Sequence, residues 1–250
     1  MRINFKLKKK HLFYLRLSFF VFFLLISCPS IKAQSLYQFG ITGQLAFPTD
    51  EFKNNAADIG GGFGFDFIYD PQSLPFGFGA SLGFIFYGHE SYREIISTSR
   101  VDFEADVSTT NSIFTGHLMF RFQPYHGRIR SYLEALIGFN YLNTDTRINE
   151  PGWGDGGIQT HNFDDAAFSY GGGVGILYRL IEKPVNSAQL SKNKKLWAIL
   201  IDIKLRYLLG GEAEYLNKGS IYRENGDLYY DVKMSRTDMF IFNIGVAFNF

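Results

Sequence analysis

The sequence is poor in cysteine, tryptophan and proline, and it has no long hydrophobic run. Its 250 residues include a single cysteine, Cys28, which excludes a disulfide framework and any zinc or iron–sulfur site that needs several thiolates. The longest apolar run, residues 17–26, covers ten residues, whereas a membrane-spanning helix needs about 20. The mean hydropathy of -0.05 also differs from that of a helical membrane protein.

The sequence also has no marked excess of charge of one sign, because it contains 25 Lys and Arg and 24 Asp and Glu. The first 33 residues hold seven of the basic side chains and no acidic one, so the remainder has 18 basic groups (25 less those seven) against 24 acidic groups. A mildly acidic remainder argues against nucleic acid as a partner.

The N-terminal segment has the organisation of a secretory signal peptide. Residues 1–16 are basic, the apolar run follows, and small residues lead to Ala33. We place cleavage after Ala33, which makes residues 1–33 the signal peptide and residues 34–250 one mature domain. Two alternatives remain open. Residues 25–28 resemble a lipoprotein box, which would leave a lipidated Cys28, and the segment could also stay as an uncleaved anchor.

Aromatic residues and glycine are abundant, with 27 Phe, 15 Tyr and 26 Gly. They recur with a period of two, so that Phe39, Ile41 and Leu45 alternate with polar or small residues. The pattern occupies residues 37–47, 59–69, 76–87, 114–123, 129–141, 168–179, 197–207 and 239–250. These segments predict an all-β fold, an eight-stranded antiparallel up-and-down transmembrane β-barrel.

A soluble lipocalin-like barrel has the same period with an apolar interior, so other observations decide the orientation of the two faces. The apolar face of every segment is nearly free of charge, and the other face is mostly Gly, Ser, Thr and Asn rather than Lys and Glu. The connections 71–75, 124–128 and 182–195 are mostly shorter than 48–58, 88–111, 142–167 and 210–237. This pattern favours an apolar exterior in a membrane, with both termini on the side of the short turns.

The predicted lumen contains a set of ionisable residues that we expect to form a charge network: Asp66, His117, Arg121, Arg130, Glu134, Arg179, Asp202, Lys204 and Arg206. Around the turn at 124–128 we expect Arg121 to lie opposite Arg130, and His117 opposite Glu134. Buried charges must be paired, so we interpret the set as a polar plug. A selectivity filter or a proton path is the alternative, and an excess of basic groups would make it favour anions.

Other motifs are weak. The glycine clusters 60–64 and 171–175 lack the helix and lysine of a phosphate-binding loop, and glycine in curved strands explains them. His89 and Ser91 form a His-x-Ser pair like that of some lipid A deacylases, but no surrounding pattern supports it. Acidic residues in the long connections could bridge to lipopolysaccharide through divalent cations, although we interpret them as solvated loops. The sequence predicts no cofactor, no metal and no catalytic set.

The C-terminal segment 243–250 carries the most specific resemblance. A polar residue, a glycine and two aromatic residues, namely Asn243, Gly245, Phe248 and Phe250, resemble the terminal assembly signal of the small OmpA/OmpX-type (porin-like) outer-membrane barrels of Gram-negative bacteria. The resemblance covers residues 35–250 and implies insertion by the outer-membrane assembly machinery.

The same resemblance implies an integral outer-membrane protein with a structural, adhesive or minor-pore role and no catalytic activity. The alternative is a small-solute channel or transporter, and an enzyme acting on lipid or peptide and a soluble periplasmic binder are further readings. The expected partners are outer-membrane lipid, lipopolysaccharide and the assembly machinery, and the chain is expected to be monomeric. Asn225-Gly226, flanked by 221–223 and 228–230, also predicts a β-hairpin in the last long connection.

Overall fold

The computed structural model describes residues 37–56, 59–71, 75–97, 102–124, 127–149, 158–182, 198–224 and 227–250. The predicted signal peptide and Cys28 lie outside these residues. Ten strands and one short helix are described: β1 (Tyr37–Pro48), α2 (Asp50–Ala56), β2 (Gly60–Tyr69), β3 (Phe76–Ser97), β4 (Asp102–Phe122), β5 (Ile129–Asn149), β6 (Ile158–Glu182), β7 (Ala198–Gly210), β8 (Glu212–Glu224), β9 (Asp227–Arg236) and β10 (Met239–Asn249). Among the described residues, no helix has the length and apolar character needed to cross a membrane.

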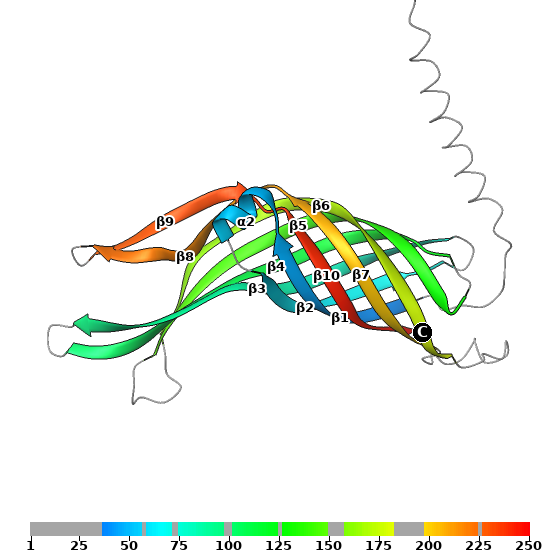
Figure 1. Cartoon of the computed structure of the whole chain (residues 1–250), viewed down its shortest axis with the longest axis horizontal. Coiled ribbons are helices and arrows are strands. Elements are labelled where there is room, and N and C mark those ends of the chain that lie inside the picture. The colour runs from blue at the N-terminus through cyan, green and yellow to red at the C-terminus, as the bar shows by residue number, and fades with distance from the viewer. Residues whose placement is uncertain are drawn as a thin grey trace, which may run out of the picture. The chain divides into compact units, whose positions relative to one another are not determined.

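Eight of these strands close into an antiparallel barrel in the order β1-β10-β7-β6-β5-β4-β3-β2 (Figure 1). The first and last barrel strands pair directly, with Gln38 opposite Asn249 and Pro48 opposite Met239. The eight strands correspond to the eight alternating segments, so the predicted fold class is confirmed. We call the end of the barrel that carries the C-terminus the turn end, and the opposite end the loop end.

The two faces of the barrel wall follow the alternation in the sequence. Large apolar side chains such as Leu118 and Phe78 are exposed on the outside, at 68% and 52%. Polar side chains at the alternate positions, such as Gln44 and Asn243, are buried in the interior. The apolar exterior agrees with a membrane barrel and excludes the lipocalin-like arrangement, in which the apolar face points inward.

Four adjacent strands are longer than the sequence pattern predicts. β3 to β6 have 21 to 25 residues, whereas the other four barrel strands have 10 to 13. β3 continues past Phe86, where its pairing with β2 ends, and β6 begins before Ser169, where its pairing with β7 ends. Residues 88–97 of β3 and 158–167 of β6 do not continue the apolar alternation of the barrel segments, so the period-two criterion missed them.

The predicted hairpin in the last connection is confirmed. β8 and β9 form a separate two-stranded antiparallel sheet in which Tyr222 pairs with Tyr229 and Glu224 with Asp227, while the turn residues 225 and 226 lie outside the described residues. The hairpin lies at the loop end, as does α2 (Figure 1). The sequence did not predict α2, which occupies part of the connection 48–58.

Glycine allows close contact between neighbouring strands. A Cβ atom on Gly245 of β10 would overlap the carbonyl oxygen of Ile41 on β1. The glycine runs at 60–64 and 171–175 lie within β2 and β6 rather than in loops at a helix start, in agreement with the sequence interpretation.

Candidate functional site

Six charged side chains from four strands meet in the middle of the barrel, and we call them the central ion-pair layer. Asp66 comes from β2, Arg121 from β4 and Glu134 from β5, while β7 contributes Asp202, Lys204 and Arg206. Each residue occupies an inward position of its strand, and each is at most 6% exposed. The period of two therefore directs all six into the lumen.

Arg206 lies at the centre of this layer and uses all three of its nitrogen atoms. Its Nε donates to Glu134 Oε1 at 2.5 Å, its Nη2 to Asp66 Oδ1 at 3.1 Å, and its Nη1 to Ser81 Oγ at 2.8 Å. In the barrel, β7 neighbours neither β2 nor β5. These ion pairs therefore cross the lumen instead of running along the wall.

The remaining members complete the network. Lys204 forms an ion pair with Asp66 and a second one with Asp202, at 3.2 Å between Nζ and Oδ2. Tyr132 donates its hydroxyl to Asp202 Oδ1 at 2.5 Å. Arg121 Nη2 donates to Glu134 Oε2 at 3.1 Å, and its guanidinium carbon lies 3.9 Å from the centre of the Tyr132 ring. A cation over an aromatic face gains further electrostatic attraction.

The charges of the central ion-pair layer balance, with three cations against three carboxylates. Moving a charge from water into the interior costs several kcal/mol unless the charge is paired and hydrogen-bonded. Every carboxylate of the layer accepts from a cation, and Asp66, Glu134 and Asp202 each have two donors. The layer is therefore a neutral unit, and the buried Arg130 outside it carries the basic excess that the sequence predicts for the lumen.

The predicted pairings around the turn at 124–128 are wrong. Arg121 lies opposite Glu134, and His117 lies opposite Gly138. The turn-end residues of β5 project beyond β4, because Ile129 already pairs with β6 whereas pairing with β4 begins only at Leu133. Such a stagger between neighbours is required when tilted strands close into a barrel.

Arg130 and Arg179 lie at the turn end, away from the central ion-pair layer. Arg179 is partly exposed and pairs with Glu182 at 2.6 Å. Arg130 is buried, and its Nε has no hydrogen-bond partner among the described residues. The expectation that both arginines join the central network is therefore corrected: their positions in β5 and β6 place them nearer the mouth of the barrel.

His117 lies in a belt of uncharged polar side chains, which separates the central ion-pair layer from the loop end. Its Nε2 is 3.1 Å from Ser169 Oγ. Gln44 of β1 donates to Asn243 Oδ1 of β10 at 3.0 Å, and Asn140 of β5, the strand next to that of His117, donates to Thr237 Oγ1 at 3.3 Å. The His117–Ser169 contact joins β4 to β6, and the Asn140–Thr237 bond joins β5 to the connection between β9 and β10.

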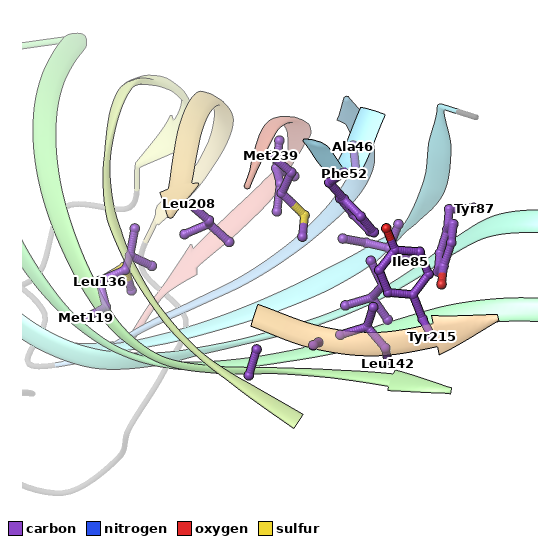
Figure 2. Packing of buried hydrophobic residues seen from close by; sticks show 14 of the residues in the cluster. Ala46, Phe52, Ile85, Tyr87, Met119, Leu136, Leu142, Leu208, Tyr215 and Met239 are labelled. Carbon is purple, nitrogen blue, oxygen red and sulfur yellow. The ribbon is translucent and has the colours of Figure 1, made fainter. Parts of the chain in front are cut away.

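Three aromatic rings, which we call the aromatic cap, cover the lumen at the loop end. Phe52 from α2 lies between Tyr87 of β3 and Tyr215 of β8, at ring-centre distances of 5.8 and 5.4 Å (Figure 2). Tyr215 is also within hydrogen-bonding distance of Ser235 on β9, at 2.8 Å. All three rings are at most 3% exposed.

Apolar side chains from the barrel wall support the aromatic cap. Ile85 and Leu142 lie next to it in Figure 2, and Ile113 belongs to the same buried cluster. Sequence reasoning missed this cluster. Apolar residues at inward positions, such as Ile85 and Tyr87, interrupt the polar face of the third segment and could have indicated it, whereas Phe52 and Tyr215 lie outside the eight alternating segments.

The remaining candidates from the sequence, the His-x-Ser pair and the acidic residues of the long connections, do not gather into one site among the described residues. His89 and Ser91 lie in β3, and His89 Nδ1 is 3.2 Å from Thr110 Oγ1. Of the acidic residues in the connections, Asp164 accepts from Tyr141 and Asp165 accepts from the backbone NH of Glu214. Within the described ranges, no group of three or more His, Cys, Asp or Glu side chains could hold a metal ion.

The terminal residues Asn243 and Gly245 face the lumen, whereas Phe248 and Phe250 face outward. Asn243 is fully buried and Phe250 is 40% exposed. The Phe250 backbone NH donates to the Tyr37 carbonyl oxygen at 2.9 Å, which closes the seam between β10 and β1. The C-terminal segment therefore has a polar lumen face and an aromatic outer face, and it pairs with β1 to close the barrel.

Comparison with known proteins finds a family model and similar solved structures. The model of the family described as outer membrane protein beta-barrel domain matches residues 18–183. No curated protein matches the sequence. The crystal structure of Neisserial surface protein A is similar to this chain at 11% identity and a TM-score of 0.39, over 88% of this chain and 100% of that chain.

Proposed function

The chain belongs to the outer membrane protein β-barrel domain family, and from that premise we propose that it is a closed barrel with a structural or adhesive role at the cell surface. The observation that carries this proposal is the central ion-pair layer, in which Arg206 joins Asp66 and Glu134 across the lumen. An eight-stranded barrel is only just wide enough for side chains. A lumen crossed by such pairs and covered by the aromatic cap leaves no wide path for solutes.

The extension at the loop end supports a role outside the cell. Short turns of outer-membrane barrels usually face the periplasm and the longer excursions face outward, so β3 to β6 and the β8–β9 hairpin would project beyond the membrane. Paired strands form a stiffer platform than loops. A partner on another cell or in the envelope would meet this platform first.

Conductance measurements test the closed-barrel proposal. We expect no steady current when the refolded mature protein is inserted in a planar bilayer. Glu134→Ala, which removes the bridge between Arg121 and Arg206, should produce small, fluctuating currents. Glu182→Ala changes an ion pair outside the central layer and is the control. A stable, large pore in the wild-type protein would overturn the proposal.

A small-solute channel is the second candidate, because the lumen contains buried polar atoms with no protein partner. Within the described part of the chain these include Nε and Nη1 of Arg121 and Oε1 of Gln44. If the barrel conducts, Arg130 and Arg179 at the turn end would favour anions there. Ion selectivity in the same recordings distinguishes this candidate from the closed barrel.

Export and assembly complete the proposal. Residues 1–33 would direct secretion, and the segment containing Asn243, Gly245, Phe248 and Phe250 would be read by the assembly machinery. The mature barrel would then lie as a monomer among phospholipid and lipopolysaccharide. No enzymatic activity is part of the proposal.

Substituting the terminal aromatic residue tests the assembly step. Phe250→Ala should lower the amount of folded protein in the outer membrane severalfold, because the terminal aromatic residue belongs to the proposed recognition segment. Phe240→Ala is a matched control, since both rings are 40% exposed on the same outer face. Quantitative outer-membrane fractionation measures the effect, and equal levels for the two variants would contradict the assignment.

A further inference from the structure

The outer wall of the barrel carries an apolar groove of about 610 Å³. It runs between two rows of side chains that cross β5, β6 and β7. Its first row is Ser131, Ile176 and Ile203, and its second row is Leu133, Val174 and Leu205, with the members of each row paired in register. The five apolar members of the two rows are 42 to 56% exposed on the outside of the barrel.

The floor of the groove is backbone. Tyr132, Gly175 and Lys204 lie between the two rows and pair with one another in register. Tyr132 and Lys204 direct their side chains into the central ion-pair layer, and Gly175 has none. No side chain from these three residues therefore rises into the groove.

A positive charge lies beyond the first row, toward the turn end. The guanidinium carbon of Arg128 is 5.1 Å from the centre of the Tyr178 ring. Tyr178 pairs with Ile129 and Ile201, and it lies two residues from Ile176, or about 7 Å along the strand. Arg128 is exposed, so its guanidinium is open to an anion on the turn-end side of the groove, beyond the first row.

We propose that this groove binds a phospholipid, with an acyl chain between the two rows and the phosphate against Arg128. The groove opens on the apolar exterior, where the surrounding solvent is hydrocarbon. Its volume falls within the range of about 300–1,000 Å³ that is usual for small-molecule sites. A phospholipid combines an apolar chain with an anionic phosphate, and a guanidinium pairs strongly with phosphate oxygens.

The choice of a phospholipid over lipopolysaccharide rests on the proposed function, which places the turn end in the periplasmic leaflet. Lipopolysaccharide would contact the loop end instead. The site is independent of the lumen, because its two rows face outward and the central ion-pair layer faces inward. Lipid binding and conductance can therefore be tested separately.

The first test measures the lipid that accompanies the full mature chain. After extraction from outer membranes in a mild detergent, native mass spectrometry should detect one retained phospholipid per wild-type barrel. Ser131→Phe fills the groove and should reduce retention about tenfold. The control is Gly61→Phe on β2, where an added Cβ has no atom within 4 Å, and retention there should equal that of the wild type. Heat-modifiable gel migration verifies that each variant is folded.

The second test distinguishes binding of the lipid's acyl chain from binding of its phosphate. Exchange of labelled phosphatidylglycerol and labelled diacylglycerol should show a preference for phosphatidylglycerol of about tenfold in the wild type. Arg128→Gln should remove this preference, and Ser131→Phe should weaken the binding of both lipids.

Equal retention in Ser131→Phe and Gly61→Phe would overturn the proposal. The proposal would also be overturned if the protein retained lipopolysaccharide in place of phospholipid, or if a second copy of the protein covered the groove in a dimer. None of these results would affect the closed-barrel proposal, which fails only if the wild-type protein conducts.

Discussion

The central ion-pair layer and the aromatic cap both obstruct the lumen, but they come from different parts of the chain. The central ion-pair layer uses barrel strands alone, and its members are tied to the register of the wall. The aromatic cap needs Phe52 from α2 and Tyr215 from β8, which lie outside the barrel sheet. A charged layer resists the loss of any member because the remaining charges stay buried, whereas a cap held by loop elements can open locally.

The largest effect should come from Glu134→Ala. This change leaves Arg121 and Arg206 buried without a shared carboxylate, and breaking a buried ion pair costs about 3–5 kcal/mol. The free energy of unfolding should fall by that amount, measured from the urea dependence of the folded gel band in detergent micelles. Glu182→Ala, in the half-exposed pair with Arg179, should cost less than about 1 kcal/mol. If both variants lost the same free energy of unfolding, the central ion-pair layer would stabilise the barrel no more than the exposed pair does.

A smaller and local effect is expected from Phe52→Ala. Removing a buried ring costs about 3 kcal/mol, but the loss should be confined to the aromatic cap, so that amide hydrogen exchange across 50–56 accelerates about 100-fold. The global unfolding midpoint should stay unchanged. Lys53→Ala, at an exposed position of the same helix, is the control. A lower midpoint for Phe52→Ala would mean that cap and barrel unfold together.

The smallest of the three effects should come from Tyr132→Phe. The variant keeps the ring beside Arg121 and removes only the hydroxyl that donates to Asp202, a hydrogen bond to a charged group worth about 1.5–3 kcal/mol. Tyr141→Phe also removes a hydroxyl that donates to an aspartate, Asp164, but at an exposed site, and it should change stability by less than about 0.5 kcal/mol. Urea unfolding measures the loss of stability in both variants. Similar losses would contradict the expectation that a buried hydrogen bond to an aspartate contributes more than an exposed one.

The sequence by itself determined the number of barrel strands and the orientation of their faces. Both follow from local alternation: the period of two predicted that Asp66, Glu134 and Arg206 point inward while Leu118 and Phe78 contact lipid. The Asn225-Gly226 signal predicted the β8–β9 hairpin for a similar reason, since the conformational preference of two turn residues suffices.

Only the tertiary structure decided which inward side chains meet. Arg121 pairs with Glu134 instead of lying opposite Arg130, because the stagger between β4 and β5 depends on closing all eight strands at once. The same closure brings Arg206 to Asp66 across the lumen and leaves Arg130 and Arg179 near the mouth. Phe52 and Tyr215 carry no periodic signal, since their burial depends on a helix and a hairpin that fold back over a lumen formed by distant strands.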